Sequence, residues 1–329
     1  IWDKSKSELF CSRDRFGIKP FYYIHSGDKF YFGSEYKPLK LSPLFSPAFN
    51  VVHITRARAC YRDETYFSCL KALPERCNLV FKEGKVCVSR YWDIDCKRKF
   101  AGSLDEKKER FFELFRDSIR LHMRSDVAVG GMLSGGMDTS SIASVVGTDF
   151  PGVRFKTFTI YYEGRNQMDE RPWVREVAST YSNIEPVFYQ PSDEEVAESF
   201  AAVVKANDTP LMGSTAISCY FVMKAAAKDK LKVILDGQGS DEYLAGYTSA
   251  FERLIAGYIR RLRFIRSLKT LKDLRRMRSS GLAAAPLFLK SLHAALTSEQ
   301  SLWGDQYRRL LPLTPMENGA PFSLEKIPG

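Results

Sequence analysis

The sequence lacks several features that would place it in a special class. No apolar stretch approaches the roughly 18 residues that a membrane-spanning helix requires, so a membrane protein is excluded. Only four His residues occur and no Cys-x-x-Cys pair is present, which disfavours a structural zinc site. Gly and Pro, with 21 and 15 residues, are too few for a collagen-like chain. The chain begins at Ile1 without a signal segment, which is typical of a piece of a longer protein.

The length and the cysteine count limit the organisation. A chain of 329 residues exceeds what one hydrophobic core usually serves, so we expect two domains. Seven Cys residues cannot pair completely, and we expect free thiols in a reducing, cytoplasmic environment. Five of them recur at intervals near nine residues: Cys60, Cys69, Cys77, Cys87 and Cys96.

Basic residues exceed acidic residues by 49 to 39, which gives a net charge of +10. Ten of the basic residues lie between residues 253 and 278 at helical spacing. Only Tyr258 and Phe264 could stack on bases there, so we interpret this segment as a solvated helix face. A nucleic-acid partner is therefore disfavoured.

Residues 1–95 have a β-rich pattern. Short strand-like runs alternate with turns that contain Gly or Pro, and residues 83–85 predict a hairpin turn. The strand-like runs are residues 9–13, 21–24, 29–33, 78–81 and 86–88. Residues 95–103 lose apolar content and turn basic, which marks a linker. We predict a first domain over residues 1–95.

From residue 104 onward the pattern alternates between helices and strands. A helix-like segment at residues 105–123 precedes an apolar run at residues 127–133. Further strands are expected at residues 155–162, 186–189 and 232–236, and helices at residues 169–181, 193–207 and 215–228. From residue 247 to residue 296 the pattern is helical. This alternation predicts an α/β domain over residues 104–329, with a parallel sheet covered by helices on both faces.

Two segments contain residues suited to binding a nucleotide. The apolar run ending at Leu133 leads through a Ser-Gly-Gly turn into a helix, which directs backbone N–H groups at one point and suits a phosphate. A plain strand-to-helix turn has the same local pattern. The strand at residues 232–236 is followed by Gly-Gln-Gly-Ser-Asp-Glu at residues 237–242. Ligands of open α/β sheets lie beyond the carboxyl ends of strands, so both segments should face one site.

These segments resemble a known superfamily. Ser-Gly-Gly-Met-Asp-Thr-Ser at residues 134–140 matches the pyrophosphate loop of the ATP pyrophosphatases. Residues 235–247 are similar to a segment of the glutamine-hydrolysing asparagine synthetases, and residues 13–23 resemble part of their glutaminase domain. The resemblance covers roughly residues 1–250. It implies a partial Ntn-hydrolase-type glutaminase domain followed by an adenine nucleotide α-hydrolase-like synthetase domain.

The resemblance also implies roles for individual residues. Asp138 and Asp241 would bind Mg²⁺, and these two residues together with Gln238 would act in catalysis. Leu133 and Ile160 would hold the adenosine through main-chain contacts. The residues implied to bind ATP are Leu133, Ser134, Gly135, Gly136, Asp138, Thr139, Ser140, Ile160, Asp236 and Gly237.

The reaction implied by the family is the ATP-dependent amidation of aspartate to asparagine. The aspartate side chain attacks the α-phosphate of ATP to give β-aspartyl-AMP and pyrophosphate, and ammonia derived from glutamine then displaces AMP. The reaction would need ATP and Mg²⁺. We expect a cytoplasmic protein without a membrane partner, and the formation of a homodimer stays an open alternative.

The sequence departs from the family pattern at several positions. Gln238 stands where an acid is frequent, and Thr139 replaces a Ser but retains the hydroxyl. Ile1 offers no nucleophile of the kind that Ntn glutaminases use, so we expect no glutamine hydrolysis from these 329 residues. The family's late lysine and its C-terminal blocks are not found. Two alternatives stay open: amidation of another carboxylate, and a catalytically inactive relative that acts as a nucleotide-binding or interaction module.

Overall fold

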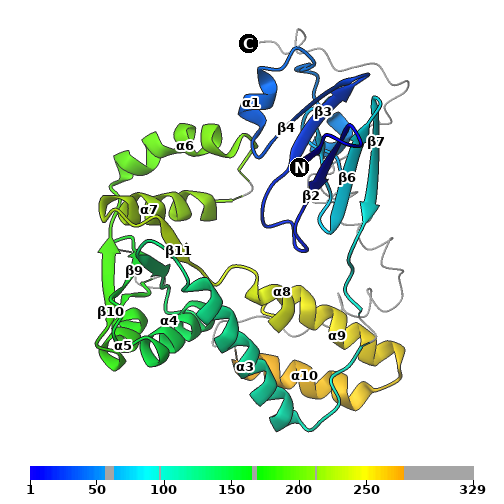
Figure 1. The fold of residues 1–329 in the computed structure, drawn as a ribbon. Helices are drawn as coiled ribbons and strands as arrows, with labels where there is room; N and C mark the ends of the chain where they lie inside the picture. Colours follow the sequence, from blue (N-terminus) through cyan, green and yellow to red (C-terminus); the bar gives the residue numbers. More distant parts are fainter. Residues whose placement is uncertain (56–62, 96–97, 165–168, 212, 278–329) are drawn as a thin grey trace, which may run out of the picture. The chain divides into compact units, whose positions relative to one another are not determined.

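The computed structural model describes residues 1–55, 63–95, 98–164, 169–211 and 213–277. The chain divides into two compact units: residues 1–95 together with, among the described residues, 247–277, and residues 96–246. Figure 1 shows the helices and strands of both units. Within the described ranges, no helix is long and apolar enough to cross a membrane. The domain boundaries expected from the sequence, residues 1–95 and 104–329, stay predictions.

Residues 1–95 form two antiparallel sheets, with strand orders β1-β2-β6-β7 and β4-β3-β5. The strands are β1 (Trp2–Asp3), β2 (Glu8–Ser12), β3 (Tyr22–Ser26), β4 (Lys29–Gly33), β5 (Lys71–Ala72), β6 (Cys77–Lys82) and β7 (Lys85–Arg90). Tyr23 of β3 is buried in one cluster with Cys11 of β2 and Leu79 of β6, so the two sheets share a core. The predicted β-rich character of residues 1–95 is confirmed. Two short helices, α1 (Tyr36–Lys40) and α2 (Val51–Thr55), are additions that the strand pattern does not indicate.

The described cysteines are Cys11, Cys69, Cys77, Cys87 and Cys219, and all five are free thiols. Burial raises the pKa of the Cys11 thiol, which keeps it protonated and unreactive near neutral pH. Cys60 and Cys96, also expected to be free, lie outside the described residues.

The second unit is built on a four-stranded parallel sheet with strand order β10-β9-β8-β11. The strands are β8 (Val129–Met132), β9 (Phe155–Ile160), β10 (Ile184–Tyr189) and β11 (Val233–Leu235). The helices are α3 (Leu104–His122), α4 (Met137–Asp149), α5 (Arg171–Thr180), α6 (Asp193–Asn207), α7 (Thr215–Lys228) and α8 (Ser240–Leu244). The predicted α/β class with a parallel sheet is confirmed.

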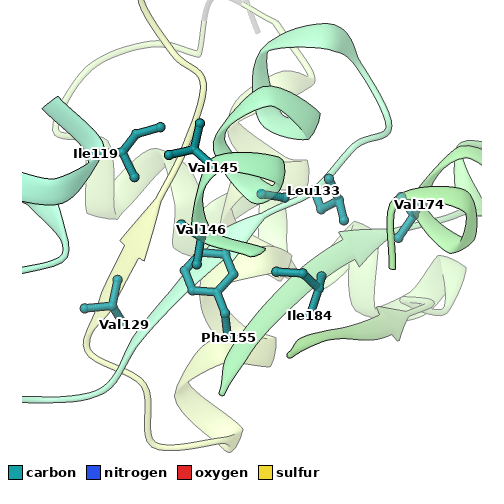
Figure 2. Packing of buried hydrophobic residues seen from close by; sticks show 9 residues of the cluster. Ile119, Val129, Leu133, Val145, Val146, Phe155, Val174 and Ile184 are labelled. Atoms are coloured by element: carbon teal, nitrogen blue, oxygen red, sulfur yellow. The ribbon is translucent and has the colours of Figure 1, made fainter. Parts of the chain in front are cut away.

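Helices cover both faces of this sheet. On one face the side chains of β8 and β9 pack against α3, α4 and α5, in the cluster that Figure 2 shows: Ile119, Val129, Leu133, Ala143, Val145, Val146, Phe155, Val174 and Ile184. On the other face Phe158 of β9 packs against Val222 and Ala225 of α7. Burial on both faces explains why the segment around β8, residues 127–133, reads as an almost continuous apolar run.

The strand order brings two distant parts of the sequence together. β11 pairs in parallel with β8, with Leu235 opposite Gly131, although about a hundred residues separate them. Parallel neighbours end at the same edge of a sheet, so the segments after Met132 and after Leu235 leave that edge side by side.

The segment after Tyr247 is helical, as expected, through α9 (Thr248–Arg260) and α10 (Phe264–Met277). Ile255 of α9 and Leu271 of α10 are buried together, which makes the pair a helical hairpin. Basic side chains on it are exposed, including Arg263, Arg266 and Lys269, in agreement with a solvated helix face. The rest of the predicted helical stretch lies outside the described residues.

Glu195 joins α6 to its neighbours in the second unit. Its carboxylate accepts hydrogen bonds from Lys224 Nζ at 2.8 Å and from Tyr189 Oη at 2.9 Å, and Ser192 at the helix start donates its backbone N–H. The hydrogen bond from Lys224, followed by those from Tyr189 and Ser192, lowers the pKa of Glu195 to about 2. The ionised form is therefore favoured in the folded state.

This shift predicts a pH-dependent contribution to stability. Because the folded-state pKa lies below the ordinary value of 4.5, the contribution is present above pH 4.5 and is lost as the pH falls toward 2. We expect Glu195→Gln to lower the free energy of unfolding at pH 6, and the difference from the wild type to shrink at pH 3. Urea unfolding at both pH values measures this. Glu198→Gln, an exposed change on the same helix, is the control, and an equal deficit at both pH values would contradict the prediction.

Candidate functional site

The strand β8 leads directly into the predicted phosphate loop. Leu133, the first residue after the strand, is buried, and its N–H donates a hydrogen bond to the carbonyl of Phe158 at 3.2 Å. The hydroxyl of Thr159 donates to the carbonyl of Leu133. These bonds to β9 hold the loop at the carboxyl edge of the sheet. Ile160, the last residue of β9, is half-buried at the same edge.

Hydroxyl groups hold the loop in shape. The Oγ1 atom of Thr139 accepts the N–H of Ser134 at 3.1 Å and lies 3.1 Å from Ser134 Oγ. Ser134 Oγ in turn accepts the N–H of Gly136 at 3.3 Å. The hydroxyls of Ser134 and Thr139, two residues implied to bind ATP, are thus already engaged within the loop. A Thr in place of Ser at position 139 keeps this internal bond, because only the hydroxyl makes it.

The loop accommodates only glycine at position 135. The φ of Gly135 is +71°, a left-handed conformation that other residues rarely adopt. A Cβ placed on it would lie 2.5 Å from the Cβ of Trp173 and 3.4 Å from the carbonyl oxygen of Glu170. The first turn of α5 therefore packs directly against the loop.

The helix α4 begins without a side-chain cap. Gly136 is its N-cap residue, so the N-cap position has no side chain to accept a hydrogen bond from the first turn. The leading N–H groups of a helix have no partner inside the helix, and its dipole makes this end positive. Ser140 Oγ, one turn further, is buried and has no hydrogen-bond partner among the described residues. Unsatisfied donors around a glycine turn fit an anionic phosphate group.

The second predicted segment meets the first one here. A Cβ on Gly237 would lie 2.8 Å from the Cβ of Asp138 and 3.3 Å from the backbone nitrogen of Thr139. Asp236, directly after β11, is exposed, and its carboxylate accepts the N–H of Gln238 at 2.7 Å. The structure therefore brings Asp236, Gly237 and Gln238 to the start of α4, while Gln238 keeps its side chain exposed.

The two carboxylates predicted to bind Mg²⁺ are placed differently. Asp138 is half-buried in the first turn of α4. Asp241 belongs to the short helix α8, and its carboxylate lies over Gly246, 1.7 Å from where a Cβ of that glycine would be. Among the described residues, no group of three or more His, Cys, Asp and Glu side chains gathers to hold a metal ion. An ion at Asp138 would therefore take its other ligands from water or from the oxygens of a bound nucleotide.

The structure adds residues that the sequence pattern missed. Arg171, at the start of α5, binds Asp169 through Nε and Nη2, both at 2.8 Å, and its guanidinium lies 4.1 Å from the ring centre of Tyr161. The hydrogen bonds from Arg171 lower the pKa of Asp169. Trp173 follows two residues later, in the same first turn, and borders the loop at Gly135. The sequence predicts a helix over residues 169–181, but no local pattern shows that this helix reaches the loop.

Comparisons with known proteins agree with this arrangement. A model of the family described as asparagine synthase matches residues 110–320, and a model described as glutamine amidotransferase domain matches residues 1–92. The chain belongs to the asparagine synthase family. The family match spans the loop, Gly237 and α5, which are the elements that form the site.

Individual relatives of this asparagine synthase family member share about a third of its residues or fewer. A Methanocaldococcus jannaschii protein provisionally named glutamine-hydrolyzing asparagine synthetase 2 is 29% identical over 334 residues, covering 94% of this chain and 60% of its own length. Asparagine synthetase 1 of Bacillus subtilis is 32% identical over 273 residues, covering 78% of this chain and 42% of its own length. Amidase chry2 of Gibberella zeae is 25% identical over 264 residues, 75% of this chain and 39% of its own. The chain thus spans 60% or less of each relative.

Proposed function

We propose that the protein is the ATP-dependent, amide-forming part of an asparagine synthetase, with aspartate as the carboxylate acceptor. The observation that supports this most strongly is the uncapped start of α4, which lies against Gly237 from the second motif. In this proposal residues 1–95 belong to a glutaminase domain and residues 104–329 to the synthetase domain.

The chemistry explains why such a site is needed. A carboxylate is a poor electrophile, so it must first be joined to a good leaving group. Attack of the aspartate side chain on the α-phosphate of ATP forms β-aspartyl-AMP and releases pyrophosphate. Ammonia then attacks the activated carbonyl, and asparagine and AMP leave.

The loop would stabilise the pyrophosphate as its charge develops. The N–H groups at the start of α4 and the unpartnered Ser140 hydroxyl would donate to its oxygens, and the glycines would allow close approach. Ser134 and Thr139 would mainly keep the loop in shape, since they bind each other. Pre-set donors of this kind need no rearrangement when the bond to the α-phosphate breaks.

The remaining predicted residues would surround the other parts of the nucleotide. Leu133 directly follows β8 and Ile160 ends the neighbouring strand β9, and their main chains would border the adenosine together with Asp236 and Gly237. Asp138 would hold Mg²⁺ at the pyrophosphate, where the ion supplies Lewis acidity to the leaving group. Asp241 would join it only after its carboxylate turns away from Gly246.

An acceptor panel tests the proposed function. The 329-residue chain is incubated with Mg·ATP and ammonium chloride as nitrogen source, and pyrophosphate release is measured with aspartate, glutamate and other carboxylates. Pyrophosphate and AMP formed in equal amounts with aspartate, together with asparagine, would support the proposal. Failure to bind ATP would overturn it.

Gln238 favours a second candidate, which is the amidation of a different carboxylate. Its neutral, exposed side chain stands where the family frequently has an acid, one residue after Gly237, which lies against Asp138. One relative, from Gibberella zeae, is named an amidase rather than a synthetase. A pyrophosphate release that depends on another carboxylate in the panel, and not on aspartate, would select this candidate.

We expect Gln238→Glu to change the rate of aspartate-dependent pyrophosphate release by about tenfold or more. The affinity for ATP should change less than about threefold, because the side chain is exposed and only its N–H is bonded to Asp236. Steady-state rates and calorimetric ATP binding measure the two effects. Gln238→Leu, which adds no charge, is the matched variant, and equal rates for Gln238→Glu and the wild type would show that position 238 does not act on this step.

A further inference from the structure

Trp173 is a large aromatic side chain left in solvent next to the phosphate loop. Its exposed fraction is 67%, whereas the next residue, Val174, is fully buried in the core (Figure 2). Successive residues of a helix point about 100° apart, so the burial of Val174 turns Trp173 away from the sheet. The exposure of Trp173 therefore follows from the way α5 is anchored.

The backbone of Trp173 is held firmly. Pro172 restricts the first turn of α5, and Glu170 precedes it as the N-cap residue. Arg171 is fixed by its two hydrogen bonds to Asp169 and by the ring of Tyr161 beneath its guanidinium. Together these contacts keep the turn that bears Trp173 at one position.

That position is against the loop. The position of a Cβ on Gly135 lies 2.5 Å from Trp173 Cβ and 3.4 Å from Cγ, the first atom of the indole ring. The indole therefore begins within van der Waals reach of the loop backbone. A phosphate bound to the N–H groups around Gly135 would have this ring as its neighbour.

An apolar side chain beside an anion site strengthens anion binding by excluding water. Water next to the loop would compete for the N–H groups and screen the positive end of α4. A ring that excludes this water strengthens each N–H···phosphate hydrogen bond, because the local dielectric constant falls. The indole N–H can also donate to an oxygen, but the wall effect needs only the ring.

We propose that Trp173 is the outer wall of the pyrophosphate pocket and contacts the pyrophosphate part of bound ATP. The inference rests on the proposed function, since it takes the loop to be an ATP site. It assigns a binding role to a residue of α5, outside both sequence motifs, and its ligand is the pyrophosphate group rather than the adenine.

Tryptophan emission tests the inference without requiring catalysis. The chain has four Trp residues, and Trp173→Phe removes the one beside the loop while keeping an apolar ring. We expect Mg·ATP and magnesium pyrophosphate to change the emission of the wild type, and AMP to change it much less. The change should disappear in Trp173→Phe and persist in Trp2→Phe, which removes another exposed indole, 54% accessible, from the other unit.

Calorimetry of ATP binding supplies the second measurement. We expect Trp173→Ala to bind Mg·ATP about tenfold more weakly, and Trp173→Phe to bind within about twofold of the wild type because it restores the wall. Circular dichroism checks that each variant is folded. If Trp173→Ala does not fold, the emission of Trp173→Phe tests the inference by itself.

The outcomes separate this inference from the proposed function. Two results would overturn the role of Trp173 and leave the proposed function standing. One is an emission change on ATP binding that persists in Trp173→Phe, and the other is full affinity for ATP in Trp173→Ala. No ATP binding by the wild type in calorimetry would overturn both.

Discussion

Gly135→Ala is expected to abolish measurable ATP binding, with a loss of affinity of about a hundredfold or more. The left-handed φ of +71° costs alanine about 1 kcal/mol or more in conformational free energy. Its methyl group would also lie 2.5 Å from Trp173 Cβ, an atom near the helix backbone that cannot swing away. The loop must then move, and its N–H groups no longer converge on one point.

Isothermal calorimetry with Mg·ATP measures this effect, and urea unfolding measures its cost to stability. We expect the free energy of unfolding to fall by about 1–3 kcal/mol, in the range of other strained backbone positions. Gly152→Ala is the matched control, because nothing lies within 4 Å of the added methyl group and its φ is not positive. ATP binding by Gly135→Ala as tight as that of the wild type would show that the loop is not the phosphate site.

Asp138→Asn is expected to remove the contribution of Mg²⁺ to ATP binding and to make pyrophosphate release undetectable. Asparagine has nearly the shape of aspartate, but it loses the negative charge that a divalent cation requires. The fold should be unaffected, because Asn can occupy the first turn of a helix and the side chain of Asp138 is only half-buried.

Binding measured with and without Mg²⁺ separates metal binding from a merely structural role. In the presence of EDTA, we expect Asp138→Asn to bind ATP as well as the wild type or slightly better, since one negative charge near the phosphates is gone. With Mg²⁺ the variant should bind about tenfold or more weakly than the wild type. Asp126→Asn removes an exposed charge elsewhere in the same unit and should behave as the wild type. Equal responses to Mg²⁺ in Asp138→Asn and the wild type would contradict a metal-binding role.

Periodicity and turn residues predicted most of the regular elements. The helices α6 and α7 begin and end as expected, at Asp193–Asn207 and Thr215–Lys228, and β4 spans Lys29–Gly33 as predicted. Such segments can be predicted because a helix buried along one face, or a strand buried on both faces, has a characteristic pattern of apolar residues in the sequence. The short helix α8 was not predicted, because its five residues, Ser240–Leu244, are too few to display the helical period of apolar residues.

The sequence by itself determined the α/β class, the strand, glycine turn and helix that form the loop, and the candidate residues around it. These depend on neighbours within a few positions, where backbone geometry and hydrophobic period decide the outcome. The tertiary structure alone decided that β11 pairs with β8, which sets Gly237 against Asp138, and that α5 sets Trp173 against Gly135. Strand order and helix placement depend on how surfaces far apart in the chain pack together, and no local pattern records that packing. The Asp241 carboxylate lies against Gly246 of the same segment, and its role as a second Mg²⁺ ligand, which the family resemblance implies, stays a prediction.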